Sequence, residues 1–398
     1  MVSVAFEPLP STDPRFLVPP PTSISVLIVG AGPTGLLASY ILAKLGVSSA
    51  IVERQPKAHA INPRSLEILR DVGLDTTELR RKGTSAEDGG WVRFVSTLQG
   101  TSIGDLPYER QEAALKTGLV SIHCRWKWKD YEIDQNGDPI SEVTNRDSGG
   151  TLKVKARFVI GADGTNSAVR KKLANVKWEI LPGHSADRVF FTSIHAKDDL
   201  RAKMTEMNRK GQLYFMLHPR VKGGIIIYDL SSSWVFARET DPVEEPISTF
   251  TEEKCHQLID PCVGPGIRYE IASVNSWFTD PRICSSYSDA TFRVFVAGDS
   301  AHSFPPSGGL GSNTGIGDVH NLCWKLKRVI DGKVVKPERF LSTYSSERIP
   351  VGRANALQSF VNASRWWPFM KSAVELMSHI SSDDDAAIEA EFQSSSWG

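Results

Sequence analysis

The hydrophobic pattern of this chain consists mainly of short, uninterrupted apolar runs. The run at 26–29 is followed by leucine and isoleucine at helical spacing between 36 and 45, and then by a second apolar run at 50–52. Continuous apolar runs are typical of buried parallel strands, and the helical spacing between them predicts a connecting helix that ends at Gly46. The pattern therefore predicts a β-α-β unit.

A different pattern fills the middle of the chain. Between about 176 and 280, short apolar segments are separated by glycine, proline or serine, which predicts an antiparallel sheet. Strand-like segments around 91–95 and 120–128, and a hairpin signal at Asn136-Gly137, extend the β-rich character. Later apolar runs at 152–160 and 292–297 again predict buried strands.

Together these elements predict the fold class α/β, in which a Rossmann-like dinucleotide-binding domain carries an inserted antiparallel-sheet domain for the substrate. The expected organisation is a Pro-rich extended arm at 1–22, a discontinuous Rossmann-like domain at 23–85, 150–175 and 283–365, a β-rich substrate-binding part at 86–149 and 176–282, and a C-terminal tail at 366–398.

Composition excludes several classes of protein. The 46 basic and 46 acidic residues balance, so no global charge favours nucleic acid or anionic lipid. No apolar stretch approaches the roughly 20 residues of a membrane span, and no secretory signal begins the chain. The five cysteines are scattered, with no metal-ligand spacing. These features predict a cytoplasmic protein without a metal site.

The glycine-rich segment after the first apolar run has the spacing of a dinucleotide-binding turn. Gly30, Gly32 and Gly35 allow a tight strand-to-helix turn, close approach to a pyrophosphate and close packing of helix on strand. Glu53 ends the next strand, where a carboxylate can bind both hydroxyls of a ribose. This segment predicts a dinucleotide but does not separate FAD from NAD.

Two further glycine-containing motifs also follow predicted strands. Gly161-Ala162-Asp163-Gly164 follows the apolar run at 152–160, and Gly298-Asp299-Ser300-Ala301-His302 follows the run at 292–297. The third motif continues into a loop at 305–313, whose glycines let the backbone approach a flat ring. Asn313 and Thr314 are expected to cap the helix that follows.

Taken together, these motifs resemble those of the class A flavoprotein monooxygenases, in particular their phenol-hydroxylase-like branch, over residues 24–360. The resemblance implies that FAD is bound and that Asp163 and Asp299 belong to the family's DG and GD motifs. The cofactor-binding residues that it implies are Gly30, Gly32, Gly35, Glu53, Arg54, Arg64, Asp163, Asp299, Pro306, Gly311, Ser312 and Asn313.

The resemblance also implies the chemistry. NADPH or NADH reduces FAD transiently, O2 gives a flavin C4a-hydroperoxide, and one oxygen atom hydroxylates a phenolic or polyketide-like aromatic substrate. Tyr214, Tyr228, Trp234 and His59 are candidate substrate contacts, although an aromatic residue on a strand more often belongs to the core. No residue is assigned as the catalytic base. The oligomeric state is left open, with a homodimer as one alternative.

Other activities fit the same motifs. Trp126-Lys127-Trp128 is similar to half of a signature of flavin halogenases, and Baeyer–Villiger or epoxidase chemistry uses the same scaffold. The resemblance implies that a segment which the family carries at the flavin edge is missing here between about 112 and 120, and many relatives continue into a thioredoxin-like domain. A non-catalytic or degenerate FAD-binding paralogue is therefore the alternative from another functional class.

Overall fold

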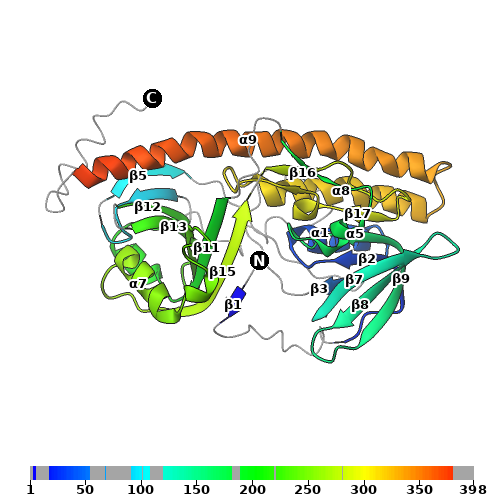
Figure 1. The fold of residues 1–398 in the computed structure, drawn as a ribbon, viewed down its shortest axis with the longest axis horizontal. Coiled ribbons are helices and arrows are strands. Elements are labelled where there is room, and N and C mark those ends of the chain that lie inside the picture. The colour runs from blue at the N-terminus through cyan, green and yellow to red at the C-terminus, as the bar shows by residue number, and fades with distance from the viewer. Residues whose placement is uncertain are drawn as a thin grey trace.

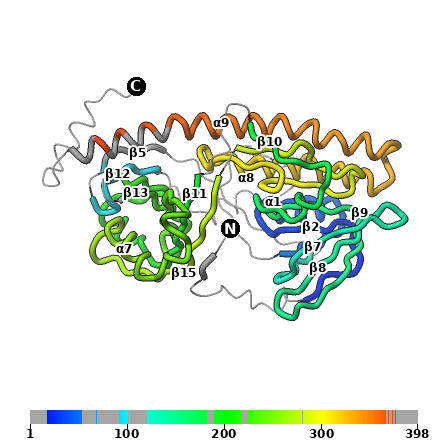
Figure 2. Tube along the Cα trace, in the orientation of Figure 1, coloured from blue at the N-terminus to red at the C-terminus, as the bar shows by residue number. Residues whose placement is uncertain are grey.

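The computed structural model describes residues 3–5, 18–53, 68, 91–100, 102–107, 120–181, 189–218, 221–279 and 281–379. Two lobes lie side by side, and the long helix α9 (Pro337–His379) runs along both of them (Figure 1; Figure 2). One lobe is built on a partly parallel sheet and the other on a mainly antiparallel sheet. This arrangement confirms the predicted fold class.

The first lobe contains a seven-stranded sheet among the described residues, and its parallel strands carry the predicted motifs. The strand order is β6-β3-β2-β9-β8-β7, and β17 pairs with the end of β9. Strands β3, β2, β9 and β17 are mutually parallel neighbours, so their carboxyl ends meet at one edge. The strands are β2 (Ser23–Val29), β3 (Ser49–Glu53), β6 (Val120–Cys124), β7 (Trp126–Ile133), β8 (Pro139–Asn145), β9 (Thr151–Gly161) and β17 (Val294–Val296).

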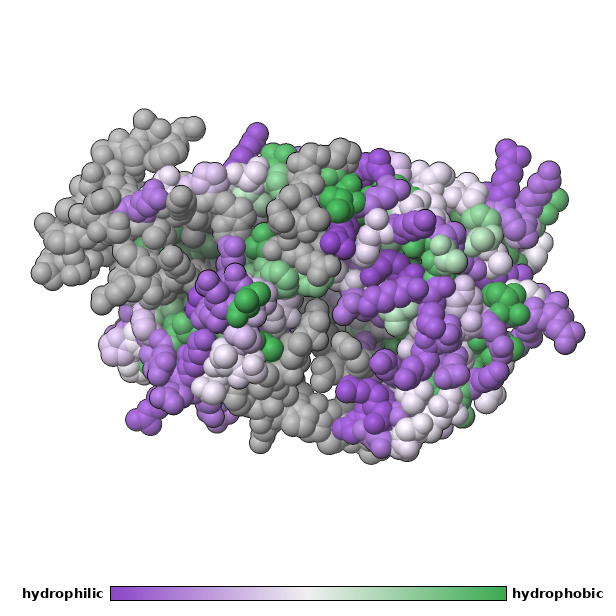
Figure 3. All heavy atoms as spheres, in the orientation of Figure 1, coloured by the Kyte–Doolittle hydropathy of each residue, from purple (hydrophilic) through white to green (hydrophobic). Residues whose placement is uncertain are grey.

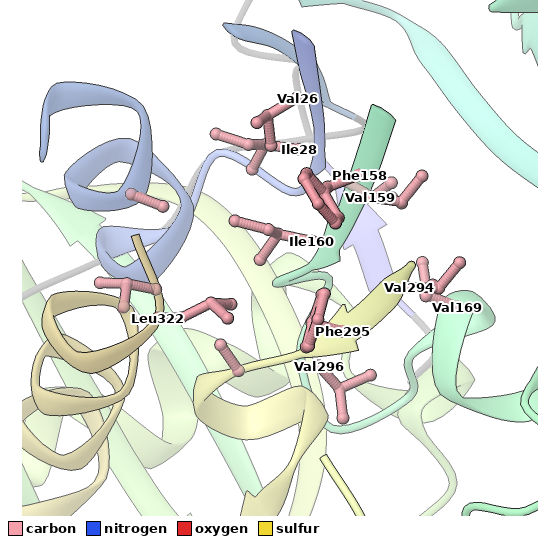
Figure 4. Close-up of a cluster of buried hydrophobic side chains, with 14 of the residues drawn as sticks. Val26, Ile28, Phe158, Val159, Ile160, Val169, Val294, Phe295, Val296 and Leu322 are labelled. Atoms are coloured by element: carbon pink, nitrogen blue, oxygen red, sulfur yellow. The ribbon is translucent and has the colours of Figure 1, made fainter. Parts of the chain in front are cut away.

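The core of this lobe lies between the parallel strands and the helices beside them. Helix α1 (Pro33–Lys44) and helix α8 (Leu310–Ile330) pack against each other. Figure 4 shows side chains of β2, β9 and β17 meeting Leu322 of α8. Ile28, Ile160 and Phe295 are fully buried, as continuous apolar runs predict for strands covered on both faces.

The second lobe contains an eight-stranded sheet among the described residues, in the order β1-β15-β11-β14-β13-β12-β4-β5. One face of this sheet packs against helix α7 (Glu252–Val263), forming a separate apolar core. The strands are β1 (Ser3–Ala5), β4 (Trp91–Val95), β5 (Ser102–Pro107), β11 (Val189–Lys197), β12 (Leu213–His218), β13 (Val221–Asp229), β14 (Ser233–Glu239) and β15 (Glu270–Thr279).

Smaller elements complete the two lobes and the junction between them. A three-stranded sheet has the order β10-β16-β18. Its strands are β10 (Trp178–Ile180), β16 (Arg282–Cys284) and β18 (His302–Ser303). The short helices of the chain are α5 (Ala168–Lys172), α6 (Arg201–Glu206), η2 (Ile247–Thr249) and η3 (Gly298–Ser300).

Two of the predicted boundaries need correction. The β-rich part was expected to include all of 86–149, but β6, β7 and β8 belong to the sheet of β2 and β9. An alternating strand pattern does not say which sheet a strand joins. The tail was expected to begin at 366, whereas α9 continues to His379 through Pro350 and Pro368.

Among the described residues, no helix has both the length and the hydropathy that a membrane span requires. On the face shown in Figure 3, polar and charged side chains predominate and apolar ones are scattered. Such scattered apolar residues are ordinary for a globular protein.

Candidate functional site

The three predicted motifs meet at the carboxyl edge of the parallel strands. A Cβ atom on Gly30 would lie 2.3 Å from the Ala162 carbonyl oxygen, so the first and second motifs touch. The Gly164 N–H donates to the Ser300 hydroxyl at 3.0 Å, which joins the second and third motifs. The three segments therefore form one contiguous surface, at the edge where open α/β sheets bind ligands.

The first motif has the geometry that its glycines predict. Gly30 has a φ of +109°, and a Cβ on Gly35 would lie 1.9 Å from the Gly30 carbonyl oxygen. Helix α1 begins after Gly32, where no described side chain caps it and no acidic residue lies in its first turn. Its N–H groups and positive dipole end are thus suited to a phosphate.

Glu53 lies at the end of β3, beside the first motif. The side chain is buried and its carboxylate accepts a hydrogen bond from the backbone N–H of Ala31. A carboxylate at the end of this strand is also suited to accept hydrogen bonds from ribose hydroxyls. The predicted partners Arg54 and Arg64, and the candidate substrate contact His59, lie outside the described residues.

Asp163 organises the second motif. Its carboxylate accepts hydrogen bonds from the N–H groups of Ala168 and Val169, at 2.6 and 3.3 Å, and from the Ser300 hydroxyl at 3.2 Å. The side chain therefore holds the start of α5 and the third motif in place. Arg170 was not among the predicted site residues. Its buried guanidinium donates to the Ser300 carbonyl at 3.0 Å and lies 4.2 Å from the Trp178 ring.

The Asp299 residue of the third motif is exposed at the surface, but its carboxyl group lies in a recess with protein atoms on most sides. Desolvation by these surroundings raises the pKa of the Asp299 carboxyl, the nearby His302 lowers it in part, and Asp318 raises it further. A Cβ on Gly311 would lie 3.8 Å from the Asp299 carboxylate. The predicted ribityl acid and the predicted ring-facing loop are therefore neighbours.

The helix after this loop begins earlier than predicted. Helix α8 starts at Leu310, and its N-cap is Gly309, with a φ of +62°. Asn313 and Thr314 do not cap it: their side chains donate to the carbonyls of Gly309 and Leu310, at 2.6 and 2.7 Å. Ser312 and Gly311 lie in this first turn, and Pro306 is exposed in the preceding loop.

A buried charged network, not foreseen in the sequence, lies beneath Asp299. Asp318 of α8 is fully buried and accepts hydrogen bonds from His302 Nε2 at 2.7 Å, from Arg348 Nε at 2.8 Å and from the Gly298 N–H at 3.0 Å. Because a carboxylate only accepts, His302 carries a proton on Nε2. Burial would raise the pKa of Asp318, but His302 and Arg348 together lower it.

The sheet of the second lobe separates its aromatic residues between two faces. Tyr214 and Trp234 are fully buried in the core beside α7, which is the more common place for a strand aromatic and excludes them as substrate contacts. Tyr228 is half-buried on the opposite face, where it meets the His195 ring edge-on. Phe191 and Trp277 stack on the same side, with ring centroids 4.5 Å apart.

The halogenase-like tryptophans have a structural explanation. Trp126 and Trp128 are both buried in the core of the first lobe, on β7. The Trp128 Nε1–H donates to the Ser141 hydroxyl on the neighbouring strand at 3.0 Å. Packing and this hydrogen bond account for both residues.

Comparison with known proteins agrees with this geometry. A family described as "FAD binding domain" matches residues 23–359. The tetracenomycin A2 monooxygenase-dioxygenase of Streptomyces glaucescens is 29% identical, covering 85% of this chain and 67% of the relative. The 2,4-dichlorophenol 6-monooxygenase of Cupriavidus pinatubonensis is 28% identical, covering 92% of this chain and 67% of the relative.

Solved structures share the fold. The flavin-dependent monooxygenase PieE, in complex with FAD and substrate, superposes with a TM-score of 0.72 at 23% identity, covering 94% of this chain and 72% of that one. The chain spans 57% to 68% of the length of the curated relatives that it matches. With the family match over most of its length and the three motifs joined at one sheet edge, the chain belongs to the family of FAD-binding domains.

Proposed function

We propose that this protein is an FAD-dependent monooxygenase that uses NADPH or NADH and O2 to hydroxylate a phenolic or polyketide-like aromatic substrate. The observation that carries the proposal is the contiguous contact of the three motifs at the carboxyl ends of β2, β9 and β17. Relatives named as monooxygenases of tetracenomycin A2 and of 2,4-dichlorophenol support the substrate class.

The residues present fit FAD at each of its parts. The uncapped start of α1 would receive the pyrophosphate, and Glu53 would bind the adenosine ribose. Asp299 would bind the ribityl chain, and the loop from Pro306 to Asn313 would lie against the ring. When bound, FAD supplies electron transfer to O2 and delivery of one oxygen atom to the substrate. The positive end of α8, which no described side chain caps, would stabilise negative charge on the ring.

The substrate would lie between this loop and the aromatic face of the second lobe. Phe191, Trp277 and Tyr228 offer flat apolar surface on the side of the sheet away from α7. Burial raises the pKa of Tyr228 to about 12, so its hydroxyl stays a hydrogen-bond donor at neutral pH. Such a face would bind an aromatic ring and exclude water from the reacting atoms.

A basic pocket beside the second motif suits the phosphates of the nicotinamide donor. It has a volume of about 300 Å³, and Arg170, Lys171 and Arg282 line it together with Trp178. None of its described lining residues is acidic. The pocket adjoins the flavin site, because Arg170 bonds to the carbonyl of Ser300, the residue after Asp299.

Replacing Lys171 with methionine is expected to raise the KM for NADPH roughly two- to fivefold, as one solvent-screened charge pair allows, with kcat almost unchanged. Lys172→Met is the matched control, because Lys172 lies on the same helix and pairs with Asp130. Steady-state NADPH oxidation at low and high salt measures the effect. Equal KM values for the two variants would show that this pocket does not bind the nicotinamide donor.

Replacing Glu53 with glutamine is expected to raise the dissociation constant for FAD roughly five- to tenfold, because a neutral amide accepts weaker hydrogen bonds than a carboxylate. Titration of the apoprotein with FAD, followed by flavin fluorescence, measures the change. Glu132→Gln, on an exposed strand position, is the control. Unchanged affinity in Glu53→Gln would contradict the assigned ribose site.

The activity itself is tested with purified, FAD-loaded protein and a panel of phenols and polycyclic aromatic compounds. NADPH consumption that a substrate accelerates, with a product heavier by one oxygen atom, would support the proposal. Consumption that ends only in hydrogen peroxide for every compound would count against hydroxylation.

A non-catalytic FAD-binding protein is the second candidate, and one observation favours it. The alignment with the tetracenomycin relative extends over 395 residues but includes only 85% of this 398-residue chain. The relative therefore has residues inside the aligned region that have no counterpart here. We infer that some of them belong to the segment whose shortening the sequence predicts near 112–120. Inserting the corresponding segment of a relative and comparing FAD affinity tests this candidate: a large gain supports it, and equal affinity contradicts it.

A further inference from the structure

We propose that α9 positions the loop that faces the flavin ring, through a stripe of residues on one side of the helix. The stripe consists of Arg348, Gly352, Asn355, Ser359 and Asn362. Their spacing of four and three residues places them on one face of the helix. That this loop faces FAD rests on the proposed function. The contacts between the stripe and the loop are part of the protein structure itself.

Ser359 is the centre of this stripe. It is fully buried, and its hydroxyl lies between the carbonyl oxygens of Pro305 and Ser307, with the Ser307 contact at 3.0 Å. A hydroxyl has one proton, so the two carbonyls share it. The loop from 304 to 309 belongs to no helix or strand. Within it, the Gly309 N–H donates to the Pro306 carbonyl at 2.9 Å and closes a turn. The position of this turn relative to the rest of the lobe depends on contacts from outside.

The loop packs tightly against the same face of α9. A Cβ on Gly308 would lie 2.8 Å from Asn362 Nδ2, and Gly308 has a φ of +96°. The positive φ limits this position to glycine, whereas the Asn362 amide is the end of a flexible side chain that can shift. The backbone of the loop can thus approach α9 closely, with its other side, including Pro306 and Gly309, exposed.

The stripe also holds the start of α8. Arg348 donates to the Thr314 carbonyl at 3.2 Å, and Asn355 donates to the Thr314 hydroxyl at 2.9 Å. A Cβ on Gly317 would lie 2.8 Å from the Arg348 guanidinium, so glycine leaves the space that this side chain occupies. The loop and the helix end that follows it are therefore fixed by one neighbouring element.

The same helix reaches the second lobe. Helix α9 contacts β12 in the antiparallel sheet as well as β16 and β18 in the first lobe. Figure 2 shows the helix continuing along both lobes. Because one continuous helix touches the flavin-facing loop and the lobe of the aromatic face, it fixes the loop relative to that face. Arg348, Asn355, Ser359 and Asn362 are thus positioning residues.

The test compares Ser359→Ala with Ser364→Ala. Ser364 is exposed on the same helix, and its hydroxyl bonds only to the Val361 carbonyl one turn away among the described residues. Ser359→Ala is expected to raise the FAD dissociation constant roughly five- to thirtyfold, because two loop carbonyls lose a donor. It is also expected to speed hydrogen–deuterium exchange of peptides covering 303–313 in the apoprotein. Ser364→Ala should change neither.

The two readouts separate the inference from the function on which it rests. If wild type binds FAD and Ser359→Ala binds it equally well, with unchanged exchange at 303–313, the inference is overturned. If wild type binds no FAD, the proposed function fails, and the exchange comparison alone decides whether Ser359 holds the loop. A purely global loss of stability would speed exchange throughout the first lobe, not selectively in this loop, and would also overturn the inference.

Discussion

Replacing Asp318 with asparagine is expected to lower the free energy of unfolding by about 3–5 kcal/mol, the range for breaking a buried charged pair by removing one partner. The carboxylate accepts from Gly298 and His302 on one oxygen and from Arg348 on the other. An amide presents an NH₂ group on one of these sides. In either orientation a buried donor therefore faces another donor.

Urea unfolding of wild type and Asp318→Asn measures this loss. Asp331→Asn is the matched control at the C-cap of the same helix, because Asp331 pairs with Lys327 and Lys333 at the surface. We expect a much smaller loss for the control, since surface ion pairs contribute little. Equal losses in the two variants would show that the buried network does not stabilise the fold.

The same pair of proteins gives a pH dependence with a defined sign. The folded-state pKa of Asp318 lies below its ordinary value, so the stabilising contribution is fully present above that ordinary value. The contribution is lost as pH falls through the folded-state pKa. The stability difference between wild type and Asp318→Asn should therefore be constant near neutral pH and shrink below about pH 4.

The structural features around the candidate site that the sequence predicted correctly are those set by local geometry. Gly30 has the positive φ expected of a tight turn, Glu53 ends the neighbouring strand, and Asp299 follows β17. Each conclusion needed only a strand, a turn and the residue after it. Parallel strands then bring such ends together without further information.

The parts that the sequence did not predict depend on contacts between distant elements. Asp318 meets Arg348, 30 residues away, only because α9 folds back over α8. One signal was present: Asp318 lies on the apolar face of its helix, between Ile316 and Leu322. A charged residue on a buried face needs a partner, but the pattern does not name it.

Strand patterns left one choice open for a related reason. Tyr214 and Trp234 were candidates for substrate contact, with the core as the more common alternative, and they lie in the core beside α7. Both faces of this sheet carry aromatic residues, so alternation alone does not say which face is the core. Only the position of α7 decides that.

Replacing Gly35 with alanine is expected to destabilise the protein by about 1–3 kcal/mol, the usual cost of overpacking, and to abolish detectable FAD binding. Helix propensity alone predicts the opposite sign, because alanine stabilises a helix interior by about 1 kcal/mol relative to glycine. Contact geometry decides between them. A Cβ at this position would lie 1.9 Å from the Gly30 carbonyl oxygen, which is backbone and cannot move without opening the turn.

Thermal unfolding and FAD titration of the apoprotein measure both effects. Gly311→Ala is the matched control for stability, because it also lies in the first turn of a helix but its Cβ would have a nearest neighbour at 3.8 Å. With room for the methyl group, propensity should prevail there and the melting temperature should stay equal or rise. If Gly35→Ala behaves in the same way and retains FAD, α1 does not pack on this turn as closely as the pyrophosphate site requires.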